Sequence, residues 1–346
     1  MRAVVFEEIG KVSVADVPEP AIEDPGDAVV RVTLSAICAS DLHFVHGKAP
    51  LERGEPIGHE AVGVVEAVGP GVSRFATGDR VVVAFNIACG ECWFCRNGQT
   101  HLCEEWRMLG GGIFGGRLGG AQAERVRVPV ADVNLLALPD DVEDERAILV
   151  GDVLTTGCYG AAMAGIAPGD TVAVVGVGPV GFFCVQAALA RGAGEVIAID
   201  MLPDRLALAQ KVGAHPVDVT ERHPQTAVAE RTGGRGADVV IEAVGHPDAF
   251  ETAVDVVRRG GTVAVVGMYT TESVKIPVGM WWTRAIQVRF AGICPVHAWW
   301  EEAMADVQAG RIDPLPIISH RLSLEEAPKG YELFGSRRAT KVLLQP

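Results

Sequence analysis

Four cysteines gathered in one short segment constrain this chain more than any other feature of its sequence. Cys89, Cys92, Cys95 and Cys103 follow the spacing C-x2-C-x2-C-x7-C. Four thiolates at tetrahedral positions form the ligand set of a structural Zn²⁺ site, which leaves no coordination position open for a reaction. The spacing therefore predicts a metal-stapled lobe, over about residues 86–108, that stabilises the fold and carries out no chemistry.

Length and composition describe an ordinary folded protein with room for two domains. A chain of 346 residues can bury two separate cores. Its hydrophobic fraction of 49% and charged fraction of 21% are those of a globular protein. The net charge of −14 argues against nucleic acid or an anionic membrane surface as a partner.

The sequence predicts neither a membrane segment nor secretion. No run of eighteen apolar residues is free of charged, Gly or Pro breaks, so we expect no membrane span. The N-terminal residues go straight into strand-like alternation, and we expect no secretory signal. Eight cysteines in such a chain are typical of reduced thiols and metal ligands, which favours a cytoplasmic protein.

The first part of the chain, to about residue 150, has the pattern of a β-rich domain. Residues 61–69, 79–85 and 123–130 form short alternating or β-branched runs bounded by turns. The Gly-rich segment 110–120 cannot form regular structure. These runs predict a partly open barrel or a sandwich.

From about residue 154 the pattern changes to strands that alternate with helices. Apolar runs at 195–200, 237–245 and 260–268 predict buried strands, with helices over 203–214 and up to Arg258 between them. Such an alternation predicts a parallel sheet covered on both faces. After about residue 295 the elements become short again. The end of the chain, from Thr340, is expected to add a last strand to the β-rich part.

A glycine motif of the form G-x-G-x-x-G follows a predicted strand and begins a predicted helix. Gly176 permits the tight turn, Gly178 lets the backbone approach a pyrophosphate, and Gly181 lets the helix pack against the strand. The helix N-terminus, which includes Pro179 and Val180, offers free N–H groups and a favourable dipole end to phosphates. The motif predicts a dinucleotide-binding domain.

Asp200 ends the second strand of that domain, nineteen residues after Gly181. A carboxylate at this position accepts hydrogen bonds from the ribose hydroxyls and repels a 2′-phosphate, which favours NAD over NADP. The alternative is that Asp200 only caps the helix that begins near Pro203. Arg205 could cover the adenine, although a solvated arginine on the helix surface fits the pattern equally well.

Cys38, His59, Glu60 and Asp152 form a second, looser set of metal-ligand residue types. A catalytic zinc takes three protein ligands of nitrogen, sulfur or oxygen type and keeps one exchangeable position. Each residue also has an ordinary role, such as a buried thiol for Cys38, a loop histidine for His59 and a helix cap for Asp152. Their spacing alone does not establish that they meet.

Several segments resemble the medium-chain zinc-dependent alcohol dehydrogenases, and together they cover essentially the whole chain. They are residues 37–43, 58–69, 78–83 and 155–157, the four-cysteine lobe and the glycine motif. Residues 151–161 and 292–295 are most similar to bacterial secondary-alcohol dehydrogenases, whose third zinc ligand is an aspartate. Liver-type enzymes have a cysteine at that position, and polyol dehydrogenases have a glutamate.

The resemblance implies an α/β protein with two domains and two zinc ions. A β-rich, GroES-like catalytic domain would comprise residues 1–153 and 295–346, and a Rossmann domain with a doubly wound parallel sheet, residues 154–294, would bind NAD. One zinc would lie in the cysteine lobe and the other on Cys38, His59 and Asp152. Glu60 would coordinate when water or substrate leaves, and Asp41 would hydrogen-bond to His59.

The implied reaction is hydride transfer between NAD(H) and a primary or secondary alcohol or its aldehyde or ketone. Zinc would polarise the substrate oxygen, Ser40 would take the alcohol proton, and His43 would pass it to solvent. One departure concerns the cofactor, because the similar secondary-alcohol enzymes often use NADP and several lack the cysteine lobe. This chain has Asp200 followed by Met201, and its lobe is intact.

Further site residues come from the resemblance and from position. Thr156 is expected beside the nicotinamide and Lys341 near the pyrophosphate. The other expected cofactor contacts are Val244, Gly267, Met268 and Ile293. Candidates for the wall of the substrate pocket are Trp106, Met108, Trp281 and Cys294. Such an apolar wall favours a small aliphatic or aromatic alcohol, although aromatic residues lie in the core more often than in a pocket.

Other functions stay open at this point. A polyol or amino-alcohol dehydrogenase of the same superfamily fits the acidic third ligand, and aldehyde dismutases share it. A non-catalytic nucleotide-binding relative is expected to lose its metal ligands, which this chain retains. The resemblance also implies a homo-oligomer, with a tetramer favoured over a dimer, in which the strand at 286–294 serves as a pairing edge.

Overall fold

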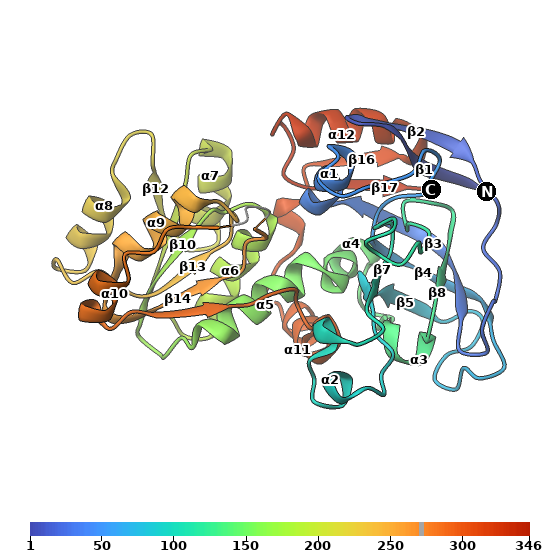
Figure 1. Ribbon diagram of the computed structural model, residues 1–346, viewed down its shortest axis with the longest axis horizontal. Coiled ribbons are helices and arrows are strands. Elements are labelled where there is room, and N and C mark those ends of the chain that lie inside the picture. The colour runs from blue at the N-terminus through green and yellow to red at the C-terminus, as the bar shows by residue number, and fades with distance from the viewer. Residues whose placement is uncertain (270–272) are drawn as a thin grey trace. The chain divides into compact units, whose positions relative to one another are not determined.

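The computed structural model describes residues 1–269 and 273–346, and over these the chain forms two compact units. The first unit contains Met1–Asp152, Pro295–Gln308 and Asp313–Pro346, and the second contains Val153–Cys294 and Ala309–Ile312. Segments from both ends of the sequence therefore fold together in the first unit, where blue and red elements lie side by side (Figure 1).

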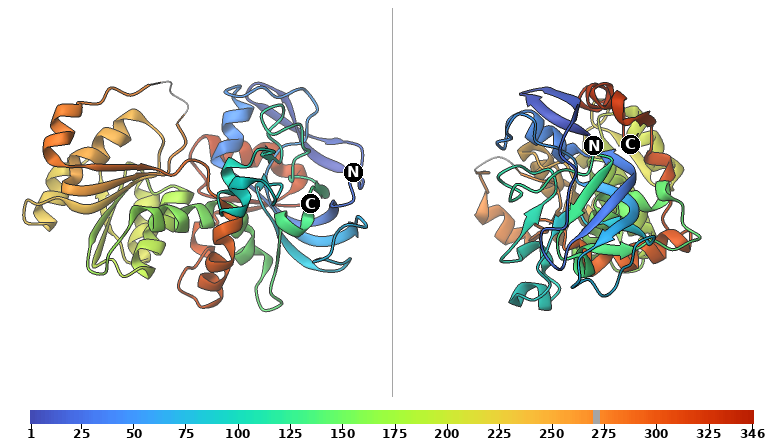
Figure 2. Two further views of the ribbon diagram at one scale, coloured as in Figure 1. Left: turned by 60° about the horizontal axis from the view of Figure 1, so that its bottom comes forward. Right: turned by 90° about the vertical axis from the view of Figure 1, so that its right-hand side faces the viewer.

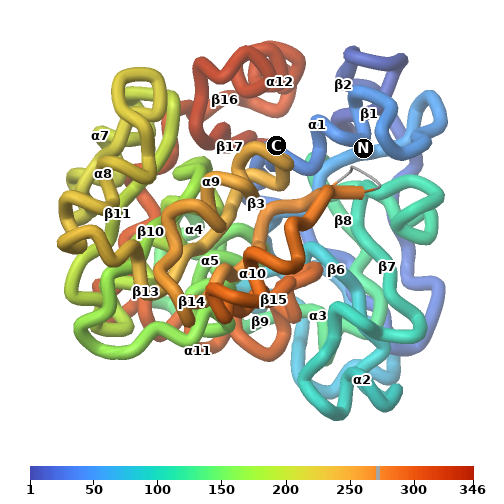
Figure 3. Tube along the Cα trace, turned by 60° about the vertical axis from the view of Figure 1, so that its left-hand side comes forward, coloured from blue at the N-terminus to red at the C-terminus, as the bar shows by residue number. Residues whose placement is uncertain are grey.

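A seven-stranded sheet forms the centre of the first unit. Its strands follow the order β16-β17-β3-β4-β5-β9, and β8 pairs with β3 outside this path. The strands are β3 (Ala28–Ile37), β4 (Glu60–Val68), β5 (Arg80–Val83), β8 (Arg125–Val128), β9 (Leu135–Ala137), β16 (His320–Ser323) and β17 (Val342–Gln345). β17 pairs antiparallel with the end of β3, with Val342 opposite Ile37, so the C-terminal segment completes the sheet (Figure 3).

A hairpin and a C-terminal helix pack together beside this sheet. The hairpin consists of β1 (Arg2–Glu8) and β2 (Lys11–Asp16), and α12 (Ala327–Gly335) lies against β2 and β16. Helix α1 (Ala39–Val45) follows β3 and also contacts α12. Apolar side chains of these elements form one core cluster, which includes Val4, Ile37, Tyr331, Phe334 and Val342. The C-terminal helix is thus part of the core that supports the start of α1.

Short elements complete the first unit. β6 (Asn86–Ile87) pairs with β7 (Arg107–Met108), and the cysteine lobe between them contains α2 (Trp93–Arg96) and η1 (Thr100–Leu102). The remaining short helices are α3 (Ala131–Asn134), α4 (Asp144–Ala147), η2 (Ile148–Gly151), η3 (Leu315–Ile317) and η4 (Leu324–Glu326), and α11 (Val296–Gln308) is longer. Residues 110–120 form turns without a helix or a continuous strand, as their glycines predict.

The second unit is built on a six-stranded parallel sheet of order β12-β11-β10-β13-β14-β15. The strands are β10 (Thr171–Val175), β11 (Glu195–Asp200), β12 (His215–Asp218), β13 (Ala237–Glu242), β14 (Val257–Val265) and β15 (Gln287–Phe290). The central strands are apolar along their length, and Val172, Ile197 and Val240 are almost completely buried. Apolar side chains on both faces require cover on both faces.

Helices provide this cover. They are α5 (Val153–Ala164), α6 (Pro179–Ala190), α7 (Pro203–Lys211), α8 (Pro224–Arg231), α9 (Pro247–Val256) and α10 (Val278–Arg284). α5 and α6 pack together on one face of the sheet and α9 packs on the other (Figure 2, left). The predicted doubly wound parallel sheet is therefore confirmed. Its strand order reverses between β10 and β13, where a Rossmann-type sheet binds its ligand.

The boundary between α9 and β14 differs from the sequence prediction in the type of element. The helix expected to continue to Arg258 ends at Val256, and β14 begins at Val257. Val257 pairs with Ala237 of β13, and the Arg258 guanidinium donates to Asp238 at 2.7 Å. These contacts with the neighbouring strand hold the backbone extended at the point where the local helical pattern would continue.

No single helix among the described residues has both the length and the apolar composition needed to span a membrane. One bent pair, Asp144–Gly151 followed by Val153–Ala164, meets that requirement by length and composition only. Most side chains of α5 are buried inside the protein.

His297 joins helix α11 to the cysteine lobe. Its Nε2 lies 2.8 Å from Asn134 Oδ1, and its Nδ1 lies 2.9 Å from Thr100 Oγ1. Asn134 Oδ1 also accepts the Ala88 N–H, so His297 Nε2 donates and its Nδ1 accepts from the Thr100 hydroxyl. Burial lowers the pKa of His297 to about 4, which keeps the ring neutral in the folded protein.

This burial predicts a pH-dependent loss of stability. The unfolded chain, in which the histidine pKa is near 6.5, binds a proton between about pH 6.5 and about pH 4 that the folded chain does not. The free energy of unfolding should therefore fall as the pH is lowered through this range, by up to about 1.4 kcal/mol per pH unit. Urea unfolding at several pH values measures the slope.

The matched variants are His297→Gln and His223→Gln, because His223 is exposed. His297→Gln should lose this contribution to the slope, and His223→Gln should keep it. Equal slopes in wild type and His297→Gln would contradict the assignment.

Candidate functional site

Three side chains of metal-ligand type converge from distant parts of the first unit. Cys38 immediately precedes α1, His59 precedes β4, and Asp152 follows η2. One ligand atom from each lies within 4.8 Å of the others, and all three residues are buried. The structure therefore brings together three of the four residues in the second predicted ligand set.

Polar contacts within this cluster are short. Asp152 Oδ2 lies 3.5 Å from Cys38 Sγ and 3.2 Å from His59 Nε2. Ser40 Oγ lies 3.2 Å from the same sulfur and 3.1 Å from the same nitrogen. The Ser40 hydroxyl is thus next to the ligand atoms, where it can exchange a proton with a small molecule bound to them.

Asp41 sets the orientation of the His59 ring. Its Oδ1 lies 3.0 Å from His59 Nδ1, and its Oδ2 accepts the Cys38 N–H at 2.9 Å. When the ring is neutral, Nδ1 donates to the carboxylate and the Nε2 lone pair is directed toward Cys38 and Asp152. That tautomer is the one a metal-binding histidine needs.

Glu60, next to His59 in sequence, pairs with Lys341 from the C-terminal segment. Both side chains are completely buried, and Lys341 Nζ contacts Glu60 Oε2. Burial raises the pKa of Glu60 to about 7, although the Lys341 charge acts in the opposite direction. Among the described residues, Glu60 Oε1 has no hydrogen-bond partner. A buried carboxylate oxygen without a donor is suited to a cation.

The position of Lys341 differs from the predicted contact with a pyrophosphate. A side chain with no exposed surface, whose ammonium is paired with Glu60, balances a buried charge and presents none to a phosphate. Burial lowers the pKa of Lys341, but the charges of Glu60 and Cys38 raise it by more, so the ammonium is kept. The prediction rested on resemblance alone, which contained no information about the side-chain partner.

The electrostatics of the cluster fit a divalent cation. Burial raises the pKa of Cys38, and the negative charge of Asp152 raises it further. Burial lowers the pKa of His59, but the Asp41 charge and a hydrogen bond to Asp152 outweigh it, so the pKa lies well above its usual value. A cation at the centre would favour the thiolate and the neutral imidazole and would replace the protons that these groups otherwise hold.

His43 lies on α1 one turn after Ser40 and is partly buried. Burial lowers the pKa of His43, as do the charges of Lys48 and His46, so the ring is neutral near pH 7. No hydrogen bond joins Ser40 and His43, both of which the structure describes. The geometry thus places a proton acceptor near Ser40 without direct contact.

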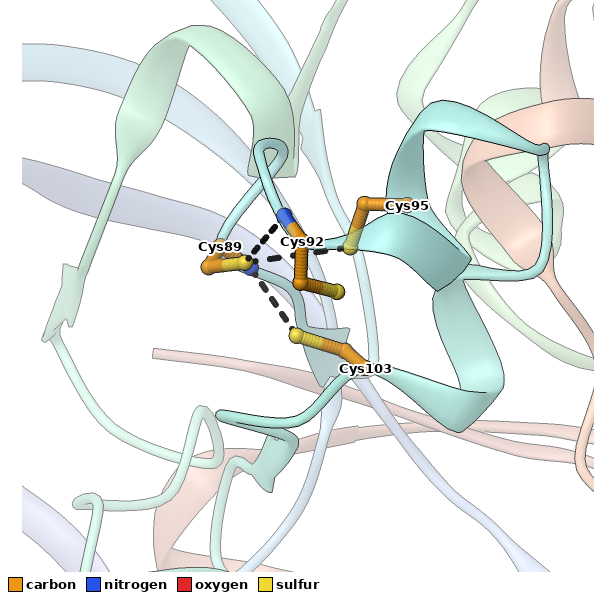
Figure 4. Close-up of side chains that lie close together, drawn as sticks. All are labelled: Cys89, Cys92, Cys95 and Cys103. Carbon is orange, nitrogen blue, oxygen red and sulfur yellow. Dashed lines mark hydrogen bonds between the residues drawn. The ribbon is translucent and has the colours of Figure 1, made fainter.

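The four cysteines of the lobe point toward one another (Figure 4). Their sulfur atoms all lie within 4.8 Å of one another. Backbone N–H groups of Cys92 and Cys89 donate to sulfur at 3.3 Å, to Cys89 Sγ and Cys103 Sγ respectively. Hydrogen bonds from the backbone lower the pKa of Cys92 to about 6, first among them that of Glu104. Burial raises the pKa of Cys95 and of Cys103, so the fit to the predicted tetrahedral metal site rests on the four converging sulfur atoms and on the donors directed at them, and a bound cation would favour the thiolates.

In the second unit, the glycine motif forms the turn between β10 and α6. Gly176 has a φ of +84°, and a Cβ there would lie 2.3 Å from Val244 Cγ2. A Cβ on Gly181 would lie 1.8 Å from the Gly176 carbonyl oxygen. A Cβ on Gly178 would have only the Arg205 guanidinium near it, at 3.4 Å. Two of the glycines are therefore required by the turn itself, and Gly178 leaves open space at the helix N-terminus.

Asp200 ends β11 next to this turn. Its Oδ2 accepts the Val177 N–H at 2.8 Å, and its Oδ1 accepts the N–H groups of Met201 and Leu202 at 2.7 and 3.0 Å. The N-cap of α7 is Leu202, so Asp200 is not the cap that the alternative interpretation expected. The carboxylate joins the end of β11 to the glycine turn.

Other predicted cofactor positions lie after the carboxyl ends of the parallel strands. Val244 follows β13, Gly267 and Met268 follow β14, and Ile293 follows β15. Val244 and Met268 are about half exposed, and Thr156 is a partly buried residue of α5. Ligands of doubly wound sheets bind outside this edge, where the strand order reverses.

The residues predicted to line a substrate pocket are divided between the units. Trp106 and Met108 belong to the first unit, where Met108 is buried and the Trp106 ring contacts Phe114 edge-on at 5.4 Å. The Trp106 Nε1 is buried and has no hydrogen-bond partner among the described residues.

Trp281 and Cys294 belong to the second unit. The Trp281 ring packs against Phe250, with 5.5 Å between ring centroids, beside the core of that unit. Cys294 is buried. Trp281 therefore packs as part of the core. These contacts do not support the prediction that it lines a substrate pocket.

Three residues near the metal-ligand cluster were not predicted. The Phe85 ring lies 6.2 Å from the His59 ring, and Gln122 and Tyr331 are connected to Asp41. Phe85 ends a predicted strand, so its side could not be assigned without the register. Gln122 and Tyr331 belong to no motif, and only the glycine run before Gln122 marked that segment as unusual.

Both parts of the chain match known protein families. Residues 24–140 match the model described as "Alcohol dehydrogenase GroES-like domain", and residues 179–309 match "Zinc-binding dehydrogenase". Over the full length of both proteins, the chain is 38% identical to an uncharacterized zinc-type alcohol dehydrogenase-like protein of Bacillus subtilis strain 168. The chain belongs to the medium-chain zinc-dependent alcohol dehydrogenase family.

Solved structures of this family have the same fold. The alcohol dehydrogenase TADH from Thermus sp. ATN1 is 44% identical, with a TM-score of 0.97 over 100% of this chain and 99% of that one. A zinc-binding dehydrogenase from Sinorhizobium meliloti 1021, solved with NADP bound, is 32% identical, with a TM-score of 0.88 over 100% and 99% of the two chains. The predicted combination of a GroES-like part and a Rossmann-type part is thereby confirmed.

Adding one methyl group to Gly181 or to Gly178 is expected to change different properties of the protein, stability in the first case and cofactor affinity in the second. Gly181→Ala should lower the free energy of unfolding by at least about 2 kcal/mol, because its Cβ meets a backbone oxygen. Gly178→Ala should stay within about 0.5 kcal/mol of wild type. It should weaken NADH or NADPH binding about tenfold, because the methyl group occupies the space that phosphates approach.

Urea unfolding measures the first quantity, and titration of dihydronicotinamide fluorescence measures the second. Unchanged cofactor affinity in Gly178→Ala would show that the phosphates do not approach this helix N-terminus. Wild-type stability in Gly181→Ala would show that the turn can relax around the methyl group.

Proposed function

We propose that this protein is a zinc-dependent oxidoreductase that transfers a hydride between NAD(H) and a primary or secondary alcohol or its carbonyl product. The convergence of Cys38, His59 and Asp152, with the Ser40 hydroxyl beside their ligand atoms, carries this proposal. A thiolate, an imidazole and a carboxylate make up the protein ligands of a catalytic zinc with one open position.

The contacts of each residue define its proposed part in the reaction. Bound zinc supplies a Lewis acid that polarises the substrate oxygen. The Ser40 hydroxyl accepts the alcohol proton during oxidation and returns it during reduction. His43, neutral near pH 7, exchanges this proton with solvent. Asp41 keeps His59 oriented, and the unpaired Glu60 Oε1 is available when the metal exchanges a ligand.

Asp200 supports NAD(H) as the cofactor. Three backbone N–H groups hold its carboxylate at the end of β11, beside the glycine turn. A fixed negative charge at this position repels the 2′-phosphate that distinguishes NADP from NAD. The relative solved with NADP makes the comparison of both cofactors necessary.

We propose two zinc ions per chain, the second on Cys89, Cys92, Cys95 and Cys103. Their sulfur atoms form a closed set of four ligands, which suits a structural ion. All eight cysteines are free thiols, and thiolate ligands persist in a reducing compartment. We therefore place the protein in the cytoplasm.

We propose a small aliphatic or aromatic substrate. In the first unit, Phe85 lies edge-on to the His59 ring, and Met108 pairs with Asn86, the residue after Phe85. Such surroundings stabilise apolar substituents and offer few partners for the additional hydroxyl groups of a polyol.

Wild-type protein should contain two zinc ions per chain and reduce ketones or aldehydes with a higher kcat/KM for NADH than for NADPH. Asp152→Ala should retain one zinc and lose more than about 100-fold in kcat/KM. Loss of a residue that only hydrogen-bonds to a metal ligand costs about 10–100-fold in activity, and loss of the ligand itself should cost more. Asp140→Ala, an exposed aspartate of the same unit, should match wild type. Metal analysis and initial rates test this.

The substrate panel separates the alternatives. A higher kcat/KM with NADPH would overturn the cofactor proposal and leave the zinc chemistry standing. Faster turnover of sorbitol or threonine than of 2-butanol would indicate a polyol or amino-alcohol dehydrogenase. Aldehyde dismutation without added reductant would indicate a dismutase. One zinc per chain and no turnover would indicate a nucleotide-binding protein without activity.

We further propose that copies of this chain associate through the edge of the six-stranded sheet. β15 is the last strand in the sheet order. Near it, the exposed fractions of Val278, Trp282 and Phe290 are 68%, 81% and 68%. A free strand edge beside apolar side chains needs cover, which a second copy with the same edge provides. A tetramer of two such pairs is favoured over a dimer.

Sedimentation should show wild type as an oligomer and the double variant Trp282→Glu, Phe290→Glu as a smaller species. Two carboxylates on the apolar surface would have to be desolvated in the interface. The control is Trp93→Glu, a substitution of an exposed tryptophan on the cysteine lobe, which should leave the size unchanged. A monomeric wild type, or a double variant of wild-type size, would refute this interface.

A further inference from the structure

A chain of buried polar groups leads from the C-terminal helix to the metal-binding histidine. The Tyr331 hydroxyl donates to Gln122 Oε1 at 2.8 Å, and Gln122 Nε2 donates to Asp41 Oδ2 at 3.1 Å. Asp41 Oδ1 in turn contacts His59 Nδ1 at 3.0 Å. All four side chains are buried, so each polar atom depends on its neighbours in this chain for its hydrogen bonds.

The surroundings of Gln122 determine which way its amide points. Its Nε2 lies 3.1 Å from both Asp41 Oδ2 and the Ala36 carbonyl oxygen. Both are acceptors, so the amide nitrogen must be on their side and the amide oxygen must face Tyr331. Burial and the charge of Asp41 raise the pKa of Tyr331 well above its usual value, which keeps the hydroxyl protonated as a donor.

The backbone beside His59 is shaped to admit this glutamine. Gly58 has a φ of +91°, and a Cβ there would lie 2.3 Å from Gln122 Cγ and 2.6 Å from its Cδ. The Gln122 N–H donates to the Ile57 carbonyl oxygen at 3.0 Å. Gln122 therefore crosses directly over the residue that precedes the histidine, and only a glycine leaves room for it.

The C-terminal end of this chain is also fixed by packing. Tyr331 lies on α12, which contacts α1, the helix that carries Asp41 (Figure 1). Its ring belongs to the core cluster that includes Val4, Ile37 and Phe334. The hydrophobic core fixes the position of α12, and this places the Tyr331 hydroxyl within hydrogen-bond distance of Gln122.

We propose that Gln122 and Tyr331 are positioning residues for the metal-binding histidine. Asp41 can hold the His59 ring only while its own carboxylate is held, and Gln122 supplies one of the two donors to Asp41 Oδ2. Without that donor the carboxylate can turn away from His59 Nδ1, and the ring loses its fixed direction toward the ligand cluster. This inference rests on the proposed catalytic zinc.

Zinc release from the purified enzyme to an excess of chelator tests the inference without a measurement of turnover. Wild type should release zinc in two phases. Asp152→Ala lacks one of the three ligands of the cluster, so the phase that is missing from this variant is the one that belongs to the cluster. Gln122→Leu should accelerate the cluster phase about tenfold, and Tyr331→Phe about threefold in the same direction. The phase of the cysteine lobe should not change in either variant.

Phe334→Leu is the matched control, because Phe334 lies in the same helix and core cluster as Tyr331 and is outside the polar chain. It should release both zinc ions at wild-type rates. Equal acceleration of both phases, or the same acceleration in Phe334→Leu, would assign a general structural role and overturn the proposal.

Two further outcomes separate this inference from the proposed function. A wild-type cluster phase in both Gln122→Leu and Tyr331→Phe, with two zinc ions per chain, would overturn the positioning role alone. Tyr331→Phe keeps this test available if Gln122→Leu does not fold. One zinc per chain in wild type that Asp152→Ala also retains would overturn the proposed catalytic zinc and the positioning role together.

Discussion

The buried ion pair between Lys341 and Glu60 ties the C-terminal segment of the first unit to the strand that follows His59. Neither side chain has exposed surface, and removing one partner of such a pair costs about 3–5 kcal/mol because the other charge stays buried. Lys341 leads into β17 and Glu60 begins β4, and these two strands flank β3. The pair therefore connects the strands on either side of the one that ends at Cys38. Cys38 and His59 lie where these strands meet, and Asp152 joins them from the end of η2.

Features encoded in short segments were predictable from the sequence, and features that depend on distant partners were not. The strand at 195–200, the glycine turn and the cysteine lobe are each defined by residues that are neighbours in the chain. The end of α9 depends on pairing with β13, and the partner of Lys341 lies 281 residues away. Periodicity and spacing contain no information on such contacts. Gln122 and Tyr331 were missed for the same reason, since a lone buried amide or hydroxyl has no signature until its partners are known.

The two candidate metal sites show this contrast within one unit. The four cysteines are held by a short loop whose backbone N–H groups are directed at the sulfur atoms, so the loop itself forms the site. Cys38, His59 and Asp152 come from three separate segments, and further groups at positions 41, 60, 122, 331 and 341 orient or neutralise them. The proposed catalytic site, which would direct a proton and a substrate, needs more constraints than a site that only holds its ion. Those constraints come from the sheet and the helices around it.

The path of the chain also sets an order in which the units can be completed during synthesis. All six strands of the second unit lie between residues 171 and 290, so its sheet can close before β16 and β17 have been made. The first unit contains β3, β4 and β5 from the outset, and these strands pair with one another, but β3 waits for β17, which is translated last. Contacts between such distant residues form slowly, because a long stretch of chain must be ordered before they add stability. The second unit can therefore fold while the sheet of the first unit is still unfinished, and the side of that sheet beside Lys341 is completed only once the C-terminal segment has been made.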